Sequence, residues 1–445
     1  MFVFVALMVV ASGMLFGYSI ASIAGVLDVI ARERDLTIFV QQLLVAAIPA
    51  ACFVGAVLAW PVSARYGRKP GLVIAFVIAI AGFLIVAAGP RTEWLFAGRI
   101  IVGLAVGLSA MIAPMYAGEI ASANRRGPVV ASFQLAVTLG ILGSYTVPYV
   151  MPQLQWPLVL GLGGVAAVLG LVSVAVLPES PRWLASFDVE RAKVAARRLG
   201  IVDDLQVQSG LQQPVEAGGL RQSLARGSTI SVLVLCSMLF VLQNLSGIDG
   251  VLYYAPQIFR GLGYSADGAA IAATFGLGLV NFLATILALW LVERAGRRPL
   301  LIVGSALMAS GLFAAVAGSL ADIPLLGMVG LCVYILAFAI SLGPLPYVMM
   351  AELFPSALRE SGIAAASAIS WLFNMLVAMT FLSLTEAIGL AGVLMLFGMI
   401  CLLTLVIAVL FVPETRGRSL EEIERDVVSG IRIRYVGRNA DYPAG

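Results

Sequence analysis

The feature that most constrains this chain is a series of apolar runs, each long enough to cross a lipid bilayer. A membrane-spanning helix needs about 20 consecutive apolar residues, and such runs recur between short charged or Gly/Pro-rich breaks. We place them at 2–27, 40–62, 71–90, 94–117, 128–150, 156–177, 229–255, 266–292, 299–320, 325–350, 361–386 and 389–412. The sequence therefore predicts an all-α polytopic membrane protein with twelve transmembrane helices.

Composition supports a membrane protein and excludes several kinds of site. Hydrophobic residues make up 61% of the 445 residues and charged residues 11%, against about 25% charged in ordinary soluble domains. The chain has no histidine, which excludes imidazole metal sites and histidine proton relays. All four cysteines lie in apolar runs, so we expect buried thiols rather than disulfides. We predict no metal, no cofactor and no nucleic-acid partner.

The positive charges are distributed unevenly between the two sides. Most of the 27 lysines and arginines fall in loops on one side of the predicted spans, and such loops face the cytoplasm. The other side holds only Arg32, Arg34, Arg91 and Arg260, while Arg99 falls inside the fourth span. We therefore expect an integral protein of the cell membrane with both termini in the cytoplasm.

Three signals occur twice in the same order, which indicates an internal repeat. "RYGRKP" at 65–70 recurs as "RAGRRP" at 294–299, and "GEIASANRRG" at 118–127 recurs as "AELFPSALRE" at 351–360. "LPESPR" recurs as "VPETRGR" before the C-terminal tail. We therefore predict two homologous six-helix halves, at 1–177 and 229–412. A cytoplasmic loop with short helices at 178–228 joins them, and a cytoplasmic tail follows at 413–445.

The repeated charges all fall at the predicted cytoplasmic ends of spans. Plain positive-inside topology would explain any one of them. The duplicated pattern of glutamate and arginine favours ion pairs between helices that form and break as the cytoplasmic side closes and opens. The predicted lock residues are Arg65, Arg68, Glu119, Arg126, Glu179, Arg182, Glu293, Arg294, Arg297, Glu352, Arg359, Glu414 and Arg416.

Taken together, the motifs resemble those of the sugar porter family of the major facilitator superfamily. They run in family order across nearly the whole chain and include "PESPRW" at 178–183, "QNLSGIDGVLYYAPQIF" at 243–259, "GPLPYVMMAELFPSALRESG" at 343–362 and "PETRGRSLEEI" at 413–423. The resemblance implies a carrier of sugars or polyols with a central site between two halves that rock against each other.

The candidate substrate residues are amides and aromatic residues inside the spans. Amides donate to and accept from sugar hydroxyls, and aromatic faces cover the apolar side of a sugar ring. The resemblance implies a substrate role for Gln134, Gln243, Asn244, Asp249, Tyr347, Trp371 and Asn374, of which Asn244, Asp249 and Tyr347 depart from the family pattern. Hydrogen bonding between helices is the alternative role. The resemblance also implies that Tyr253 and Tyr254 form an outer gate.

The residue after "FGY" bears on whether a proton gradient drives transport. Proton-driven relatives usually carry an aspartate there, paired with an arginine at the position of Arg99, whereas this chain has Ser19. Serine does not titrate in the useful range, which favours facilitative transport over proton symport. Asp249 is the candidate for a relocated coupling site, because intramembrane carboxylates usually have a function.

The predicted function is the transport of a monosaccharide, a hexose or a pentose, across the bilayer by a monomer, with a proton as the candidate co-substrate. A polyol, cyclitol or organic-acid carrier remains an alternative, as does a sugar sensor that binds without transport. Drug efflux would need a different site, and no nucleophile, base or metal cluster indicates an enzyme.

Overall fold

A computed structural model describes most of the chain. Its described residues are 1–445 except 90, 121–125, 201–226, 265–267, 355–358 and 437–445. The side chains at 2, 126–131, 227–229, 293, 359–361, 364, 420 and 421 are also outside the description.

The first six predicted spans correspond to long helices, with two local differences. The first span ends at Ala21 and is followed by a separate short helix, α2, while Leu162 and Gly163 divide the sixth span into two helices. The helices are α1 (Phe2–Ala21), α2 (Leu27–Glu33), α3 (Ile38–Tyr66), α4 (Arg68–Ala88), α5 (Thr92–Ile120), α6 (Arg126–Val150), α7 (Trp156–Gly161) and α8 (Gly164–Val176). We call this set the first half.

The remaining spans form a second set in which two helices are interrupted. The breaks lie at Ser246–Gly247 and between Ile340 and Leu345. The helices are α13 (Gly227–Leu245), α14 (Ile248–Tyr253), α15 (Ala255–Gly261), α16 (Ala269–Ala295), α17 (Arg297–Leu320), α18 (Pro324–Ile340), α19 (Leu345–Leu353) and α20 (Arg359–Leu410). We call this set the second half.

The predicted twelve crossings are confirmed. Eleven helices of the described residues are long and apolar enough to span a bilayer, and one of them covers Ala365–Leu410. Gly389, with φ of 74°, interrupts the helical geometry inside that segment and divides it into two spans. The fold is the all-α twelve-helix architecture expected, and no strand occurs among the described residues.

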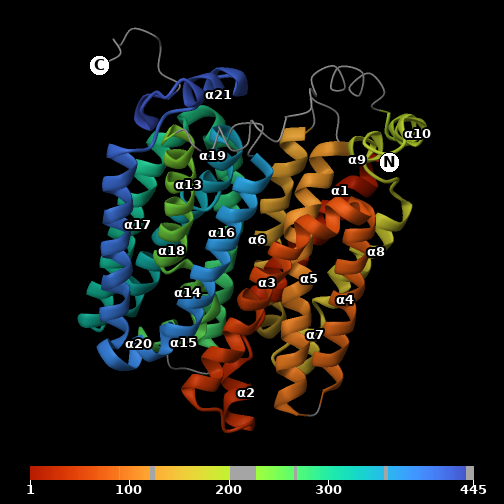
Figure 1. Cartoon of the computed structure of the whole chain (residues 1–445). Helices are drawn as coiled ribbons and strands as arrows, with labels where there is room; N and C mark the ends of the chain where they lie inside the picture. Colours follow the sequence, from red (N-terminus) through yellow and green to blue (C-terminus); the bar gives the residue numbers. More distant parts are fainter. Residues whose placement is uncertain (90, 121–125, 201–226, 265–267, 355–358, 437–445) are drawn as a thin grey trace.

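The two halves pack side by side, the first coloured red to yellow and the second green to blue (Figure 1). Within the first half, α1 packs against α6 and α8, and α5 packs against α3 and α4. Within the second half, α17 packs against α18 and α20. The halves meet mainly where α3 contacts α20 and where α6 contacts α16. The exact boundaries at 177 and 229 stay a prediction, because much of the intervening loop lies outside the described residues.

Short surface helices mark one end of the bundle. The helices α9 (Pro181–Ala185), α10 (Val189–Leu199) and α21 (Leu420–Val428) lie at the same end as the start of α1, and α2, α7 and α15 lie at the opposite end (Figure 1). We call these the α21 end and the α2 end.

The surface helices α10 and α21 each begin with a side-chain cap. The side chain of Asp188 accepts from the amide of Arg191 at the start of α10, and Gly200 ends that helix with φ of 74°. Ser419 and Glu422 form both bonds of a capping box at α21. The four cysteines are free thiols, three of them buried.

A glycine allows α1 and α6 to approach backbone to backbone. A Cβ atom added at Gly140 would lie 2.5 Å from the carbonyl oxygen of Met14 and 2.9 Å from the amide nitrogen of Tyr18. Small residues permit this kind of close contact between membrane helices. In contrast, a Cβ atom at Gly276 on α16 would meet nothing within 4 Å.

We predict that Gly140→Ala lowers stability by about 1–3 kcal/mol, the usual cost of overpacking. Gly276→Ala is the matched control, because the added methyl group meets open space. Thermal unfolding of the purified proteins in detergent measures both. If Gly140→Ala had the same melting temperature as Gly276→Ala, the close backbone contact between α1 and α6 would be contradicted.

Candidate functional site

A cavity lies at the centre of the bundle and is lined by both halves. The first half contributes residues from α1 and α6, and the second half contributes residues from α13, α14, α16, the α18–α19 segment and α20. All seven residues predicted to bind substrate line it: Gln134, Gln243, Asn244, Asp249, Tyr347, Trp371 and Asn374. Their roles stay predictions, but the structure brings them together.

The break between α13 and α14 turns polar side chains toward this cavity. Gly247 has φ of 91°, a left-handed conformation that favours glycine. A Cβ atom there would lie 2.0 Å from the ring of Phe397, and one at Gly250 would lie 2.6 Å from Phe381. The two glycines therefore let the helix deform and allow α20 to pack closely.

A second break faces the first. Between α18 and α19 the amide of Gly343 donates to Phe338, and the carbonyl oxygen of Gly343 accepts from Nε2 of Gln243 at 3.0 Å. Irregular backbone at membrane depth is tolerated only where it is buried in protein or lines a cavity. Gln243 therefore satisfies a freed carbonyl group, while its own oxygen accepts no hydrogen bond from a described residue.

A chain of hydrogen bonds joins α14 to α20 beside the cavity. Nδ2 of Asn374 donates to Oδ1 of Asp249 at 2.7 Å, and the hydroxyl of Tyr253 donates to Oδ1 of Asn374 at 2.7 Å. The second carboxylate oxygen, Oδ2 of Asp249, is buried without a hydrogen-bond partner among the described residues. This arrangement leaves a free acceptor at the cavity wall.

Aromatic rings flank the polar groups. Trp371 lies 5.3 Å from Phe16 between ring centroids, which brings an aromatic face from each half to the cavity. Tyr347 packs edge-on against Phe240 at 4.8 Å. Asn244 donates to the hydroxyl of Ser370 at 3.1 Å and is held by that bond. Rings and amides around one cavity suit a ligand with one apolar and one hydroxylated face.

The cavity also contains residues that the sequence reading missed. Asn281 and Thr285 of α16 line it, and both are buried. An amide inside an apolar span is a signal that could have found Asn281. Gln134 forms no hydrogen bond within the described part of the chain, and Ile141 on the same helix supplies an apolar wall. The polar groups therefore lie mainly on the second half.

The residues predicted for the outer gate do not line the cavity, and neither do Ser19 and Arg99 of the predicted coupling site. Tyr254 stacks on Phe381 and donates to the carbonyl group of Ala378 at 2.8 Å. Tyr253 and Tyr254 are buried, and neither lines the cavity. Both hydroxyls lie within electrostatic range of the buried Arg99. The gate role stays a prediction.

Ser19 and Arg99 do not form a charged pair with each other or with Asp249. The hydroxyl of Ser19 donates to the carbonyl group of Leu15 at 2.5 Å. Arg99 donates to the carbonyl groups of Leu44 at 2.8 Å and Val45 at 3.4 Å. No described carboxylate lies within ion-pair distance of Arg99.

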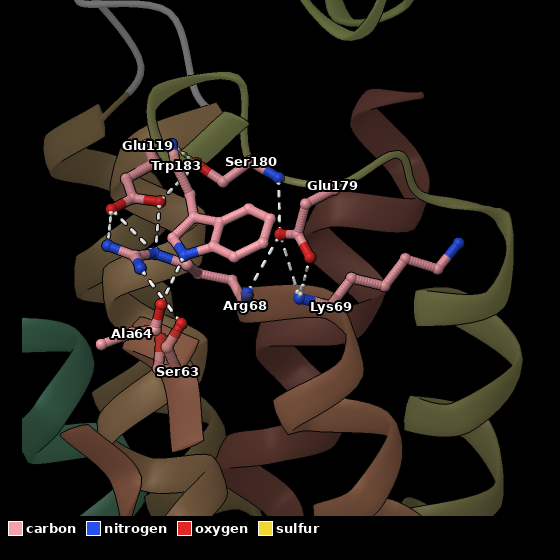
Figure 2. A network of polar contacts seen from close by, with 8 residues as sticks. All are labelled: Ser63, Ala64, Arg68, Lys69, Glu119, Glu179, Ser180 and Trp183. Atoms are coloured by element: carbon pink, nitrogen blue, oxygen red, sulfur yellow. Dashed lines mark hydrogen bonds and ion pairs between the residues drawn. The ribbon is translucent and has the colours of Figure 1, made fainter. Parts of the chain in front are cut away.

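An ion-pair network joins three helix ends of the first half at the α21 end (Figure 2). Arg68 pairs with Glu119 at 2.8 Å, and Ser180 donates to the same carboxylate. The carboxylate of Glu179 accepts from the amides of Arg68 at 3.0 Å and Lys69 at 3.2 Å, at the N-terminus of α4, where helix geometry favours anions. Burial raises the pKa of Glu179, although these amide donors act in the opposite direction.

The second half repeats this network. Arg297 pairs with Glu352 at 2.8 Å, and the hydroxyl of Thr415 donates to that carboxylate at 2.5 Å. Glu414 accepts from the amides of Arg297 at 3.0 Å and Arg298 at 3.1 Å. Each network lies within one half, so these bonds fix the helices of a half to one another and do not join the halves.

A glycine precedes each network. Gly67 has φ of 100°, and its Cβ atom would lie 2.3 Å from Glu179. Gly296 has φ of 89°, and its Cβ atom would lie 2.8 Å from Glu414. The turn therefore requires glycine twice over, by conformation and by space.

The other predicted lock residues lie outside these networks. Arg65 and Arg294 are exposed and lie over the rings of Tyr66 and Trp290. Arg182 forms no ion pair with a described residue, and Arg416 contributes only its backbone amide to Glu414. The side chains of Arg126, Glu293 and Arg359 are outside the described residues.

The α2 end is joined across the halves by contacts that the sequence reading did not predict. Asp28 of α2 pairs with Arg260 of α15 and accepts from Gln257 at 2.8 Å. Burial lowers the pKa of Arg260. Nearby, the hydroxyl of Tyr145 donates to the carbonyl group of Leu252 at 2.6 Å, again between halves. These bonds join the two halves to each other.

Comparison with known proteins agrees with this arrangement. The family model described as "Sugar (and other) transporter" matches residues 5–427. The chain belongs to the sugar transporter family. The galactose-proton symporter of Escherichia coli (strain K12) is 35% identical over 98% of this sugar transporter and 96% of its own length. The glucose transporter GlcP of Staphylococcus epidermidis is 32% identical over 93% of this chain and 95% of its own length.

A solved structure supports the fold. The xylose transporter XylE of E. coli in a partially occluded inward-open conformation has a TM-score of 0.80 and 28% identity, covering 94% of this chain and 99% of that chain. This match places the protein in the major facilitator superfamily, as the motifs implied. Members of the family are transporters and not enzymes.

We predict that Glu119→Gln and Glu352→Gln each destabilise the protein by about 2 kcal/mol, between the values for exposed and fully buried ion pairs. Each change removes the carboxylate charge that pairs with Arg68 or with Arg297. Because the two networks share no residue, the double variant should lose the sum of the single effects. Thermal unfolding in detergent measures this, and strong non-additivity would show that the networks are coupled across the halves.

Proposed function

We propose that the protein is a secondary transporter that carries a monosaccharide through the bilayer by alternating access, with the sugar bound in the central cavity. The observation that carries this proposal is the set of amides, hydroxyls and aromatic rings that both halves place around one cavity. A site between two repeats is where such transporters bind substrate. A single chain builds the whole cavity, so a monomer is sufficient.

The names of the relatives support a sugar of five or six carbons. They include a galactose-proton symporter, an arabinose-proton symporter and a D-xylose transporter. Two of these names state proton symport, which supports coupling to a proton over the facilitative mode that Ser19 predicted. We therefore propose sugar–proton symport.

Orientation follows from charge. Arginines and lysines cluster in the loops of the α21 end, so by the positive-inside rule we propose that this end faces the cytoplasm. The contacts of Asp28 at the α2 end then close the outer side. The two charged networks would keep the cytoplasmic ends of each half rigid while the halves rock, as two locks within halves rather than one lock between them.

The activity is tested by counterflow in proteoliposomes. Vesicles are loaded with unlabelled sugar, and uptake of labelled galactose, glucose, arabinose, xylose and inositol is followed. We expect exchange of at least one hexose or pentose. Exchange of inositol alone would favour the cyclitol alternative, and binding without any exchange would favour a sensor.

We predict that Gln134→Ala raises the KM for the transported sugar roughly tenfold, the effect of about 1.4 kcal/mol of lost hydrogen bonding. Thermal stability should not change, because Gln134 bonds to no described side chain. Gln243→Ala should raise KM and also lower stability, because the carbonyl group of Gly343 loses its donor. Gln155→Ala is the control, since Gln155 is exposed and lies outside the central cavity.

We predict that Asp28→Asn lowers the external KM by up to about fivefold, because exposed ion pairs contribute about 0.2–1 kcal/mol. Weakening the closed α2 end raises the fraction of outward-facing carrier, and apparent affinity rises with that fraction. The exchanged pair Asp28→Arg with Arg260→Asp should restore the wild-type value. An unchanged KM in Asp28→Asn, measured by initial uptake rates, would show that this ion pair does not control the outer side.

A further inference from the structure

One carboxylate stands apart from the other acidic groups of the spans. The candidate spans contain five described acidic residues, and four of them lie at a span end or beside the turn at Gly389: Glu93, Glu119, Glu352 and Glu386. Asp249 alone lines the central cavity. The chain has no histidine, so no imidazole offers an alternative proton carrier.

The carboxylate of Asp249 is only half satisfied. Its Oδ1 accepts from Asn374 at 2.7 Å, and its Oδ2 is buried without a partner. The residue is 7% exposed. A buried ionised carboxylate is costly unless it is paired and fully hydrogen-bonded, so this site favours either a bound proton or a donor supplied by a ligand.

The groups around Asp249 leave its charge uncompensated. The phenols of Tyr253 on α14, Tyr334 on α18 and Tyr347 on α19 lie within electrostatic range of its carboxylate. Neutral Asn374 contacts it from α20. Arg99 interacts with Tyr253 rather than with Asp249, and no described arginine or lysine forms an ion pair with it. Binding a proton is therefore the way available within the described site to neutralise it.

We propose that Asp249, which lines the sugar cavity, is the residue that binds the co-transported proton. This inference rests on the proposed function. Its carboxylate takes one proton from the water on one side and releases it to the other, and no other bond changes. When sugar displaces water from the cavity, the cost of the ionised form rises, so sugar and proton bind together. When the cavity is empty, water solvates the charge and the proton leaves.

The test compares Asp249→Asn with Asp249→Glu in proteoliposomes, using labelled galactose or the panel sugar that the wild-type protein exchanges fastest. Three quantities are measured: accumulation driven by an imposed pH gradient, alkalinisation of the medium when sugar is added, and counterflow without a gradient. Glu386→Gln is the matched control, because it removes an exposed carboxylate from the second half outside the cavity.

We expect the wild-type and Glu386→Gln proteins to accumulate sugar and to alkalinise the medium. Asp249→Asn should lose both. Asp249→Glu should accumulate sugar with its pH profile displaced upward, since a glutamate titrates about 0.4 pH units higher than an aspartate in model peptides.

Accumulation by Asp249→Asn equal to that of the wild-type protein would overturn the proposal, as would wild-type counterflow without gradient-driven accumulation. If Asp249→Asn also loses counterflow, Asp249→Glu decides: a displaced pH profile supports the proposal, and an unchanged one overturns it. Failure of the wild-type protein to exchange any sugar of the panel contradicts the proposed function first, and this inference falls with it.

Discussion

The structure depends on the requirement that every backbone polar group inside a bilayer find its partner within the protein. Continuous helices meet it along most spans. The two interrupted spans meet it by facing each other, because Gln243, beside one break, donates to the carbonyl group of Gly343 in the other. Irregular backbone in lipid would be too costly, so the breaks can exist only around an interior cavity. The requirement that makes the rest of the chain helical therefore also determines where a polar site can be.

The duplicated networks show how a repeat is used at the membrane surface. In both halves, a positive-φ glycine starts a helix whose first amides bind one glutamate while its first arginine pairs with another. Glu119 and Glu352 each contact two segments that are distant in sequence, and Glu179 and Glu414 each bind one helix N-terminus. Each network therefore joins the ends of several segments at the membrane surface. For one half to rock against the other, each half must move as a rigid unit. Helices that shifted independently within a half would not transmit the movement from one side of the membrane to the other.

Much of this architecture could be predicted from the sequence, because length, hydropathy and motif order are local properties. The twelve spans are confirmed, and the seven residues predicted to bind substrate come together around one cavity. Partners were harder to predict. Nothing in the spacing of Glu119 shows that it pairs with Arg68, and Asp28 meets Arg260 only because the two halves pack side by side in the folded protein. Asn281 was missed because one amide in a long apolar run resembles packing.

The asymmetry of the cavity has a physical consequence for how substrate and proton interact. Gln243, Asn244, Asp249 and Asn374 all come from the second half, whereas the first half offers Gln134 and mostly apolar walls. A ligand held mainly by one half moves with that half, and the other half then acts as a movable cover that admits or excludes water. In the proposed mechanism Asp249 lies on the half that binds most of the ligand, so the hydration of its carboxylate would change when the other half closes over the cavity. A carboxylate in that position senses both the ligand and the conformation without needing a charged partner such as Arg99.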